Sequence, residues 1–288
     1  MIINDLDDYF MKPYLIDGIG DVYPINIFNY ERFRQLASKY IIQGINTLHN
    51  IYKVPKNTNV LDYFVDTAIR MDKEIIKLNE AKGYIPNNEQ EKNQYDELMK
   101  LLDLYNSGKV VTYLIKELEE LFSMVLQKQV KFYCDLENPL DNYYFKIEDE
   151  ELFITKENFN ELKEVIMWQN ILFEPPTSPS KIGNELIQQT IEVEFGKNGD
   201  SGNLASICSI VSVNSGVSDE QIKKYSYYRL MYDFASINRQ HGNIFTFMLR
   251  SQGCNEAIIT DLSQAIDLHK NPYDIIFKKH KHEQGNIK

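Results

Sequence analysis

The chain has 288 residues, of which 43% are apolar and 25% charged, so it can bury a sizeable core and is not disordered throughout. Lys and Arg number 31 against 42 Asp and Glu, and the net charge of −11 argues against a nucleic-acid-binding protein. No apolar stretch approaches the roughly 18 residues that cross a bilayer, and the acidic N-terminus is unlike a secretory signal, so we expect a cytoplasmic protein that is not membrane-bound.

The first third of the chain is predicted to be a hairpin followed by two helices. Residues 13–28 are expected to be extended, with a turn at 17–21. A helix is predicted from about Asn29, a suitable N-cap, because apolar residues then recur three and four apart as far as Leu48. A second helix is predicted over 59–82.

The middle of the chain changes from helical to strand-like patterning. Residues 83–96 have almost nothing to bury and are predicted to be an exposed loop or part of an insertion, which is placed at 83–108. Residues 110–126 carry one unbroken apolar stripe and should form a core helix. Aromatic and β-branched residues at 130–134, 143–147 and 152–155 predict a small antiparallel sheet.

A proline-rich segment at 174–179 is the predicted domain boundary, because its prolines stop any helix. The predicted fold is mainly α with a small antiparallel β-sheet. Its parts are an N-terminal α+β region over 1–174, a linker with a short helix over 175–200, a bundle-like helical region over 201–277, and a tail over 278–288.

The C-terminal region contains the predicted partner-binding site. Ser218–Gln221 forms a capping-box pattern, which predicts the start of a long helix over 219–239. This helix has two apolar faces, and one of them carries Tyr225, Tyr228 and Tyr232. The tyrosine face is either a second core surface or a surface that binds a partner, since tyrosine gives a large, rigid contact area. In the second case, the three rings should be partly exposed.

No motif for catalysis or metal binding is found. The sequence lacks HExxH, GxSxG and GxxxxGK[ST]. His49, His241 and His269 have no partner three or four residues away, and His280 and His282 lie in the tail. Cys134, Cys208 and Cys254 lie too far apart for a CxxC site and should be reduced and largely buried. We therefore expect no catalytic site, no metal and no cofactor.

Five stretches of the sequence resemble a known family. They are Gly18–Pro24, Val165–Asn170, Ser209–Val213, Tyr225–Phe234 and Asp267–Tyr273. These stretches are similar to tail assembly chaperones of tailed phages and prophages of low-GC Gram-positive bacteria. The similarity extends over residues 13–55 and 110–277, although none of its motifs is chemically diagnostic.

The resemblance implies a non-enzymatic protein in the cytoplasm of the bacterial host. Its partner would be the tape-measure protein, whose long apolar helices it would coat until tail-tube subunits displace it. Such helices aggregate when exposed, and a second apolar face on a partner helix can cover them. The chain is long for such a chaperone, so a structural protein of the tail or capsid is the alternative, and an enzyme without a recognisable motif is a minor one.

Overall fold

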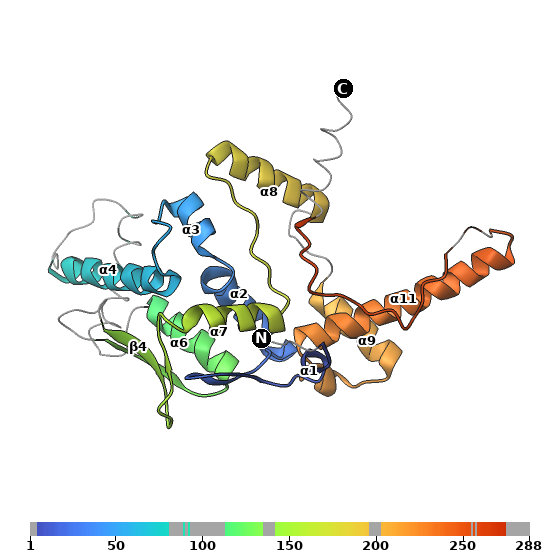
Figure 1. Cartoon of the computed structure of the whole chain (residues 1–288), viewed down its shortest axis with the longest axis horizontal. Helices are drawn as coiled ribbons and strands as arrows, with labels where there is room; N and C mark the ends of the chain where they lie inside the picture. The colour runs from blue at the N-terminus through green and yellow to red at the C-terminus, as the bar shows by residue number, and fades with distance from the viewer. Residues whose placement is uncertain are drawn as a thin grey trace. The chain divides into compact units, whose positions relative to one another are not determined.

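A computed structural model gives the fold of residues 5–80, 89, 92, 113–134, 142–195, 203–254, 256 and 258–274 (Figure 1). Over these residues the protein is mainly α-helical with two small antiparallel sheets, as the sequence predicts. Most of the predicted insertion at 83–108 and the whole tail at 278–288 lie outside the described residues.

Two compact units alternate along the sequence. Unit 1 consists of Met1–Tyr14, Val22–Val54 and Lys163–Lys288, and unit 2 consists of Leu15–Asp21 and Pro55–Leu162. Each unit is assembled from separated segments. The proline-rich stretch at 174–179 lies within unit 1, so it does not mark the division between the units.

The chain begins with α1 (Asp5–Tyr9) and a hairpin of β1 (Tyr14–Ile16) and β2 (Gly20–Val22). The predicted hairpin turn is confirmed. Gly18 and Gly20 have φ angles of 75° and 97°. Side chains strongly disfavour such angles, so glycine is needed at both positions.

The described part of unit 2 includes the helices α4 and α6 and a three-stranded sheet. Helix α4 (Val60–Glu80) contacts α6 (Tyr113–Leu126), and α6 contacts β3 (Val130–Cys134). The apolar stripe of α6 is buried, and the rings of Phe122 and Phe145 meet edge to face at 5.0 Å. The core helix predicted at 110–126 is confirmed over the part that the structure describes.

The three predicted strands form one antiparallel sheet in sequence order. Strand β4 (Tyr143–Ile147) lies between β3 and β5 (Phe153–Ile154). In this register Phe132 is opposite Phe145, and Phe145 is opposite Ile154. Phe145 and Ile154 are buried, so the alternation of the strands presents this face to the core.

The outer edge of β3 is closed by side chains of α6. Ser123 Oγ accepts a hydrogen bond from the Val130 N–H at 3.0 Å, and Glu119 Oε1 accepts one from the Phe132 N–H at 2.8 Å. An edge strand whose amides already have partners offers less to another strand. The sheet is therefore protected from edge-to-edge pairing here.

In unit 1, the single helix that the sequence predicts from Asn29 to Leu48 is wrong, because the structure divides this stretch into shorter helices. The observed segments are η1 (Ile27–Asn29), α2 (Tyr30–Tyr40) and α3 (Ile45–Tyr52). The carboxylate of Glu174 accepts the Gly44 N–H at 3.0 Å and the Thr47 hydroxyl at 2.6 Å. A side chain distant in sequence thus satisfies the start of α3, which local periodicity cannot reveal.

The C-terminal half of the chain is helical. Its elements are α7 (Phe159–Gln169), α8 (Lys181–Phe195), α9 (Leu204–Ser215), α10 (Asp219–Ile222) and α11 (Tyr227–Ser251). Helices α9 and α11 pack together around a buried apolar cluster that includes Val211 and Leu230. Gly216, with φ of 66°, ends α9 in the left-handed conformation typical of a helix C-terminus.

The predicted helix over 219–239 is wrong in both its start and its end. The capping-box residues begin only the short α10, and the long helix runs instead from 227 to 251. The backbone between them pairs with an earlier segment, because Tyr225 O accepts the Ile27 N–H at 2.8 Å and Lys223 O accepts the Phe28 N–H at 3.2 Å. Ser226 Oγ then caps α11 by accepting the N–H of Arg229 at 3.1 Å.

Candidate functional site

The three tyrosines predicted as a binding face lie in unit 1, and two of them are buried. Tyr225 is 8% exposed and Tyr228 is 1% exposed, whereas Tyr232 is half-buried. The expected partial exposure is therefore wrong for Tyr225 and Tyr228. Their burial supports the alternative reading, a second core surface, and for Tyr232 partner binding stays a prediction.

Tyr225 is part of a cluster of rings and charges between α1 and α11. The Arg229 guanidinium lies 4.0 Å from the ring centroid of Tyr225 and 5.1 Å from that of Tyr9. The Tyr9 hydroxyl donates a hydrogen bond to Asp233 Oδ1 at 3.1 Å, and burial raises the pKa of both groups. These contacts tie α1 to the first turns of α11.

Tyr228 belongs to a second aromatic group that includes the only tryptophan of the chain. The ring of His269 stacks on Trp168 with centroids 3.5 Å apart, and on Tyr228 with centroids 5.4 Å apart. Tyr232 continues the group, 6.2 Å from Tyr228 and 5.4 Å from Tyr9. The imidazole therefore contacts two aromatic rings that come from different helices.

A buried carboxylate completes this group. The Asp8 side chain is 1% exposed, and its Oδ2 accepts the indole N–H of Trp168 at 2.8 Å. His269 Nε2 lies 3.7 Å from the same oxygen. Asp8 Oδ1 and His269 Nε2 are buried without a hydrogen-bond partner. We name Asp8, Trp168 and Tyr228 the Trp168 slot, with His269 as its occupant.

The sequence analysis missed the Trp168 slot because its residues come from three distant parts of the chain. Trp168 and His269 both lie in stretches that carry the family resemblance, but no spacing links either of them to Asp8. A lone histidine in sequence is usually a surface or satisfied side chain. Only the tertiary structure brings the carboxylate and the imidazole together.

Beyond its packed first turns, α11 continues into an exposed apolar segment. Figure 1 shows the chain turning back after α11 and running beside the helix as a segment without regular structure, which we name the strap (Ile258–Asp274). Asn243 pairs with Thr260, donating to its carbonyl at 2.6 Å and accepting its N–H at 2.9 Å. Arg239 donates to the carbonyl of Gln264. These bonds fix the strap to the helix.

We name residues 239–251 of α11 and 258–264 of the strap the arm. Its exposed apolar residues are Ile244 at 53%, Phe245 at 62%, Phe247 at 58% and Met248 at 58% on α11, with Ile258 and Leu262 on the strap. At about 100° per residue, the four helical positions cover an arc of about 160°. The sequence analysis missed them because it ended the helix at 239.

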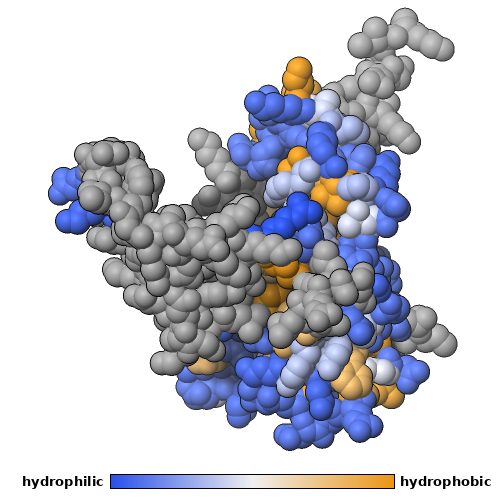
Figure 2. Space-filling model, turned by 90° about the vertical axis from the view of Figure 1, so that its left-hand side faces the viewer, coloured by the Kyte–Doolittle hydropathy of each residue, from blue (hydrophilic) through white to orange (hydrophobic). Residues whose placement is uncertain are grey.

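Elsewhere the surface is more mixed. On the face drawn in Figure 2, the coloured residues are mostly hydrophilic, and the hydrophobic ones form separate groups. Exposed apolar residues are normal when scattered and informative when they are contiguous. The arm is the described segment in which four such residues fall within five consecutive positions of one helix.

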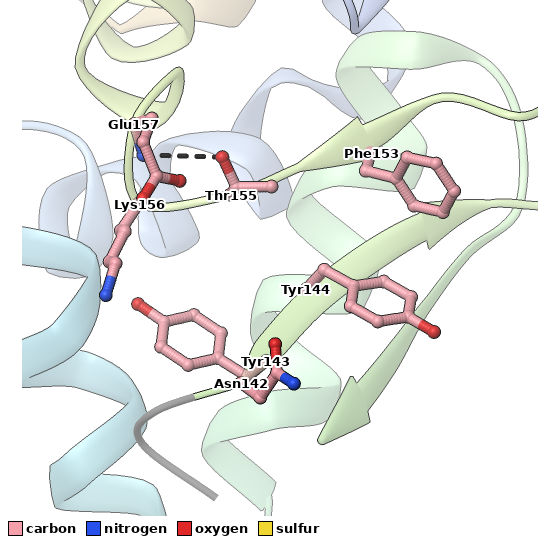
Figure 3. A pocket seen from close by; sticks show the side chains of 7 residues that line it. All are labelled: Asn142, Tyr143, Tyr144, Phe153, Thr155, Lys156 and Glu157. Atoms are coloured by element: carbon pink, nitrogen blue, oxygen red, sulfur yellow. Dashed lines mark hydrogen bonds between the residues drawn. The ribbon is translucent and has the colours of Figure 1, made fainter. Parts of the chain in front are cut away.

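Unit 2 has an open pocket of about 430 Å³ beside β4 and β5 (Figure 3). Figure 3 shows the rings of Tyr144 and Phe153 on one side and the Lys156 ammonium group on the other. Burial raises the pKa of Tyr143, and hydrogen bonding with Thr155 lowers the pKa of Glu157. Both groups thus keep one protonation state near neutral pH, which does not favour acid–base catalysis here.

The cysteines differ from their predicted burial. Cys134 and Cys208 are only partly buried and Cys254 is exposed, and none of the three forms a disulfide. Burial raises the pKa of the Cys208 thiol. A raised pKa makes the Cys208 thiol less reactive, and Cys254 is the most accessible of the three thiols because it is exposed.

No protein-family profile, curated protein or solved structure matches the chain. In the described part of the chain, no helix is long and apolar enough to span a bilayer. The same residues contain no group of three His, Cys, Asp or Glu side chains placed to hold a metal ion.

Proposed function

We propose that this chain is a non-enzymatic assembly protein that uses its arm to cover an apolar helical segment of a partner protein. The observation that carries the proposal is the run of exposed apolar side chains at 244–248. A helix-in-groove contact is made by apolar anchors three and four residues apart, which is the spacing found here. Ile244 and Met248 would be its central anchors, with Phe245 and Phe247 at the two borders of this face.

The size of the surface supports this role. A buried aromatic side chain covers about 150–250 Å². With Phe245 62% and Phe247 58% exposed, these two rings alone leave roughly 180–300 Å² of surface in solvent. A contiguous exposed apolar patch of several hundred Å² often marks an interaction site, and Ile244, Met248, Ile258 and Leu262 extend the exposed apolar surface of the arm beyond these two rings. An amphipathic helix on the partner is the occupant whose chemistry fits them.

The resemblance to tail assembly chaperones supplies the finer form of the proposal. In this form the partner is the tape-measure protein of a tailed phage or prophage, bound in the cytoplasm of the bacterial host before tail-tube subunits displace the chaperone. The arm would take the place of the predicted tyrosine face as the binding surface. Neither form requires a catalytic group or a cofactor.

The test is co-expression with the tape-measure protein encoded in the same genome, followed by pull-down. We expect the wild-type chain to capture it and the Phe245→Ala/Phe247→Ala variant to lose capture at an unchanged melting temperature. Phe28→Ala removes an exposed phenylalanine outside the arm and is the matched control. Retention of capture by the arm variant would refute the arm as the site. Recovery of the chain in purified particles would favour the structural alternative.

A further inference from the structure

The apolar face of the arm lies on the side of α11 that the strap leaves open. At about 100° per residue, Ile244 and Met248 lie about 40° apart and mark the middle of this face. The strap is bound through Arg239 and Asn243, which lie about 120–160° around the helix from that middle. The strap therefore does not cover the face, and the apolar side chains at 244, 245, 247 and 248 are 53–62% exposed.

The charge of the chain does not oppose self-association through this face. Unit 1 contains 18 basic residues (Lys and Arg) and 18 acidic ones, so its net charge is zero and the net charge of −11 comes from unit 2. Residues 234–255 include no Asp or Glu, and Arg239 and Arg250 lie about 140–160° around the helix from the middle of the face. The centre of a protein–protein interface is typically depleted of charged residues. Two copies can therefore meet at the arm without bringing like charges together.

The spacing of the four apolar residues is self-complementary. They lie symmetrically about Thr246, at the two positions before it and the two positions after it. If two such helices run antiparallel about a two-fold axis at this level, Ile244 of each copy faces the partner's Met248. Phe245 and Phe247, at the two borders of the face, then each lie beside the same residue of the partner. A two-fold interface requires one surface that matches itself in this manner.

We infer that a second copy of this chain covers the arm, by antiparallel pairing of α11 with α11 about a two-fold axis at Thr246. Helices α1 and α9 pack against α11, and the second half of α11 extends beyond α9 (Figure 1). Antiparallel pairing places the positive end of each helix dipole beside the negative end of the other, whereas parallel pairing places like ends together. The inference concerns the same surface as the proposed function, but it requires no other protein.

The exposed area sets the strength of this pairing. Phe245 and Phe247 leave roughly 180–300 Å² in solvent, and Ile244 and Met248 add about 70–130 Å². Two copies would thus bury about 500–850 Å² of apolar surface, to which polar neighbours such as Gln240 add. Stable complexes bury about 1,200–2,000 Å², and weak, reversible ones bury less. We therefore expect a reversible dimer whose dissociation constant is micromolar or weaker.

The experiment measures the mass of the full-length chain by sedimentation equilibrium between about 5 and 500 µM, with a reducing agent present so that Cys254 forms no disulfide. We expect a monomer–dimer equilibrium in the wild type. Met248→Glu should raise the dissociation constant at least about tenfold, because pairing would bury a carboxylate without a partner. Val213→Glu is the matched control, since Val213 is an exposed apolar residue of α9 outside the arm, and it should leave the equilibrium unchanged.

A double variant tests the orientation of the two helices. In Ile244→Lys/Met248→Glu, antiparallel pairing brings the new ammonium group of each copy opposite the new carboxylate of the other. Parallel pairing instead brings ammonium against ammonium and carboxylate against carboxylate. The double variant should therefore dimerise more strongly than Met248→Glu, and more weakly than the wild type because exposed ion pairs contribute little.

Each measurement can contradict the inference. A wild-type chain that stays monomeric at the highest concentration overturns the dimer, even if a variant fails to fold. A dimer that Met248→Glu leaves intact overturns the arm as its surface, and a double variant that dimerises less than Met248→Glu overturns the antiparallel register. Partner capture is measured separately by pull-down. A monomeric chain that captures its partner therefore refutes the dimer alone, and a dimer that captures nothing refutes the proposed function alone.

Discussion

Replacing Tyr228 by alanine is the most direct test of the corrected position of the tyrosines. If Tyr228 were part of a binding face, its loss would weaken partner capture and leave the fold intact. The side chain is instead 1% exposed, beside His269 and Tyr232. Its removal should therefore leave a cavity in unit 1.

The magnitude can be worked from the burial. Truncation of a large buried aromatic side chain to alanine lowers the free energy of unfolding by about 3–5 kcal/mol. For a unit of this size, each kcal/mol corresponds to about 2–4 °C in melting temperature. The expected fall for Tyr228→Ala is thus about 6–20 °C.

Phe245→Ala on the same helix is the matched control. This ring is 62% exposed, and a substitution at such a surface position changes the free energy of unfolding by about 0.5 kcal/mol or less. Thermal melts followed by circular dichroism at 222 nm, where helices give a strong signal, should separate the two variants clearly. Equal melting temperatures would refute the assignment of Tyr228 to the core and of Phe245 to the surface.

Three other predictions follow from single contacts. Ser123→Ala should lower the free energy of unfolding by about 1–3 kcal/mol in a urea titration, because the buried Val130 N–H loses its acceptor. Burial raises the pKa of Asp233, so its ionisation opposes folding, and this cost grows as the pH rises above the range in which a free aspartate titrates. Asp233→Asn keeps an acceptor for the Tyr9 hydroxyl and should be more stable than the wild type at pH 7 but not at pH 3. Cys254 should account for the fast phase of labelling by a thiol reagent in the native protein, and Cys254→Ser should abolish that phase.

The sheet and the core helix could be predicted because their signals are local. The strand segments are rich in aromatic and β-branched residues, and the observed β3 and β4 coincide with the predicted residues 130–134 and 143–147. Helix α6 shows the same agreement, since one continuous apolar stripe needs one buried face. In each case a pattern within the segment itself specified the element.

The errors in the helices have tertiary causes. Glu174 supplies acceptors at the start of α3, and the backbone around Tyr225 pairs with residues 27 and 28. Each contact joins segments more than 100 residues apart in the sequence. Propensity is a weak prior that such contacts override. Ser226 is the N-cap of α11, and the capping box that begins eight residues earlier starts only the short α10.

The choice between a core face and a binding face could not be made from periodicity at all. A helical stripe shows which residues share a direction, and it does not show what lies in that direction. Tyr228 and Phe245 lie on the same helix and are both aromatic, yet Tyr228 is buried with the ring of His269 stacked on it, and Phe245 is exposed. The coverage depends on Trp168 and His269, which no spacing rule connects with α11. A surface of this kind is therefore found by asking which apolar residues remain in solvent after the chain has satisfied its own core, and in this chain those residues lie on the arm.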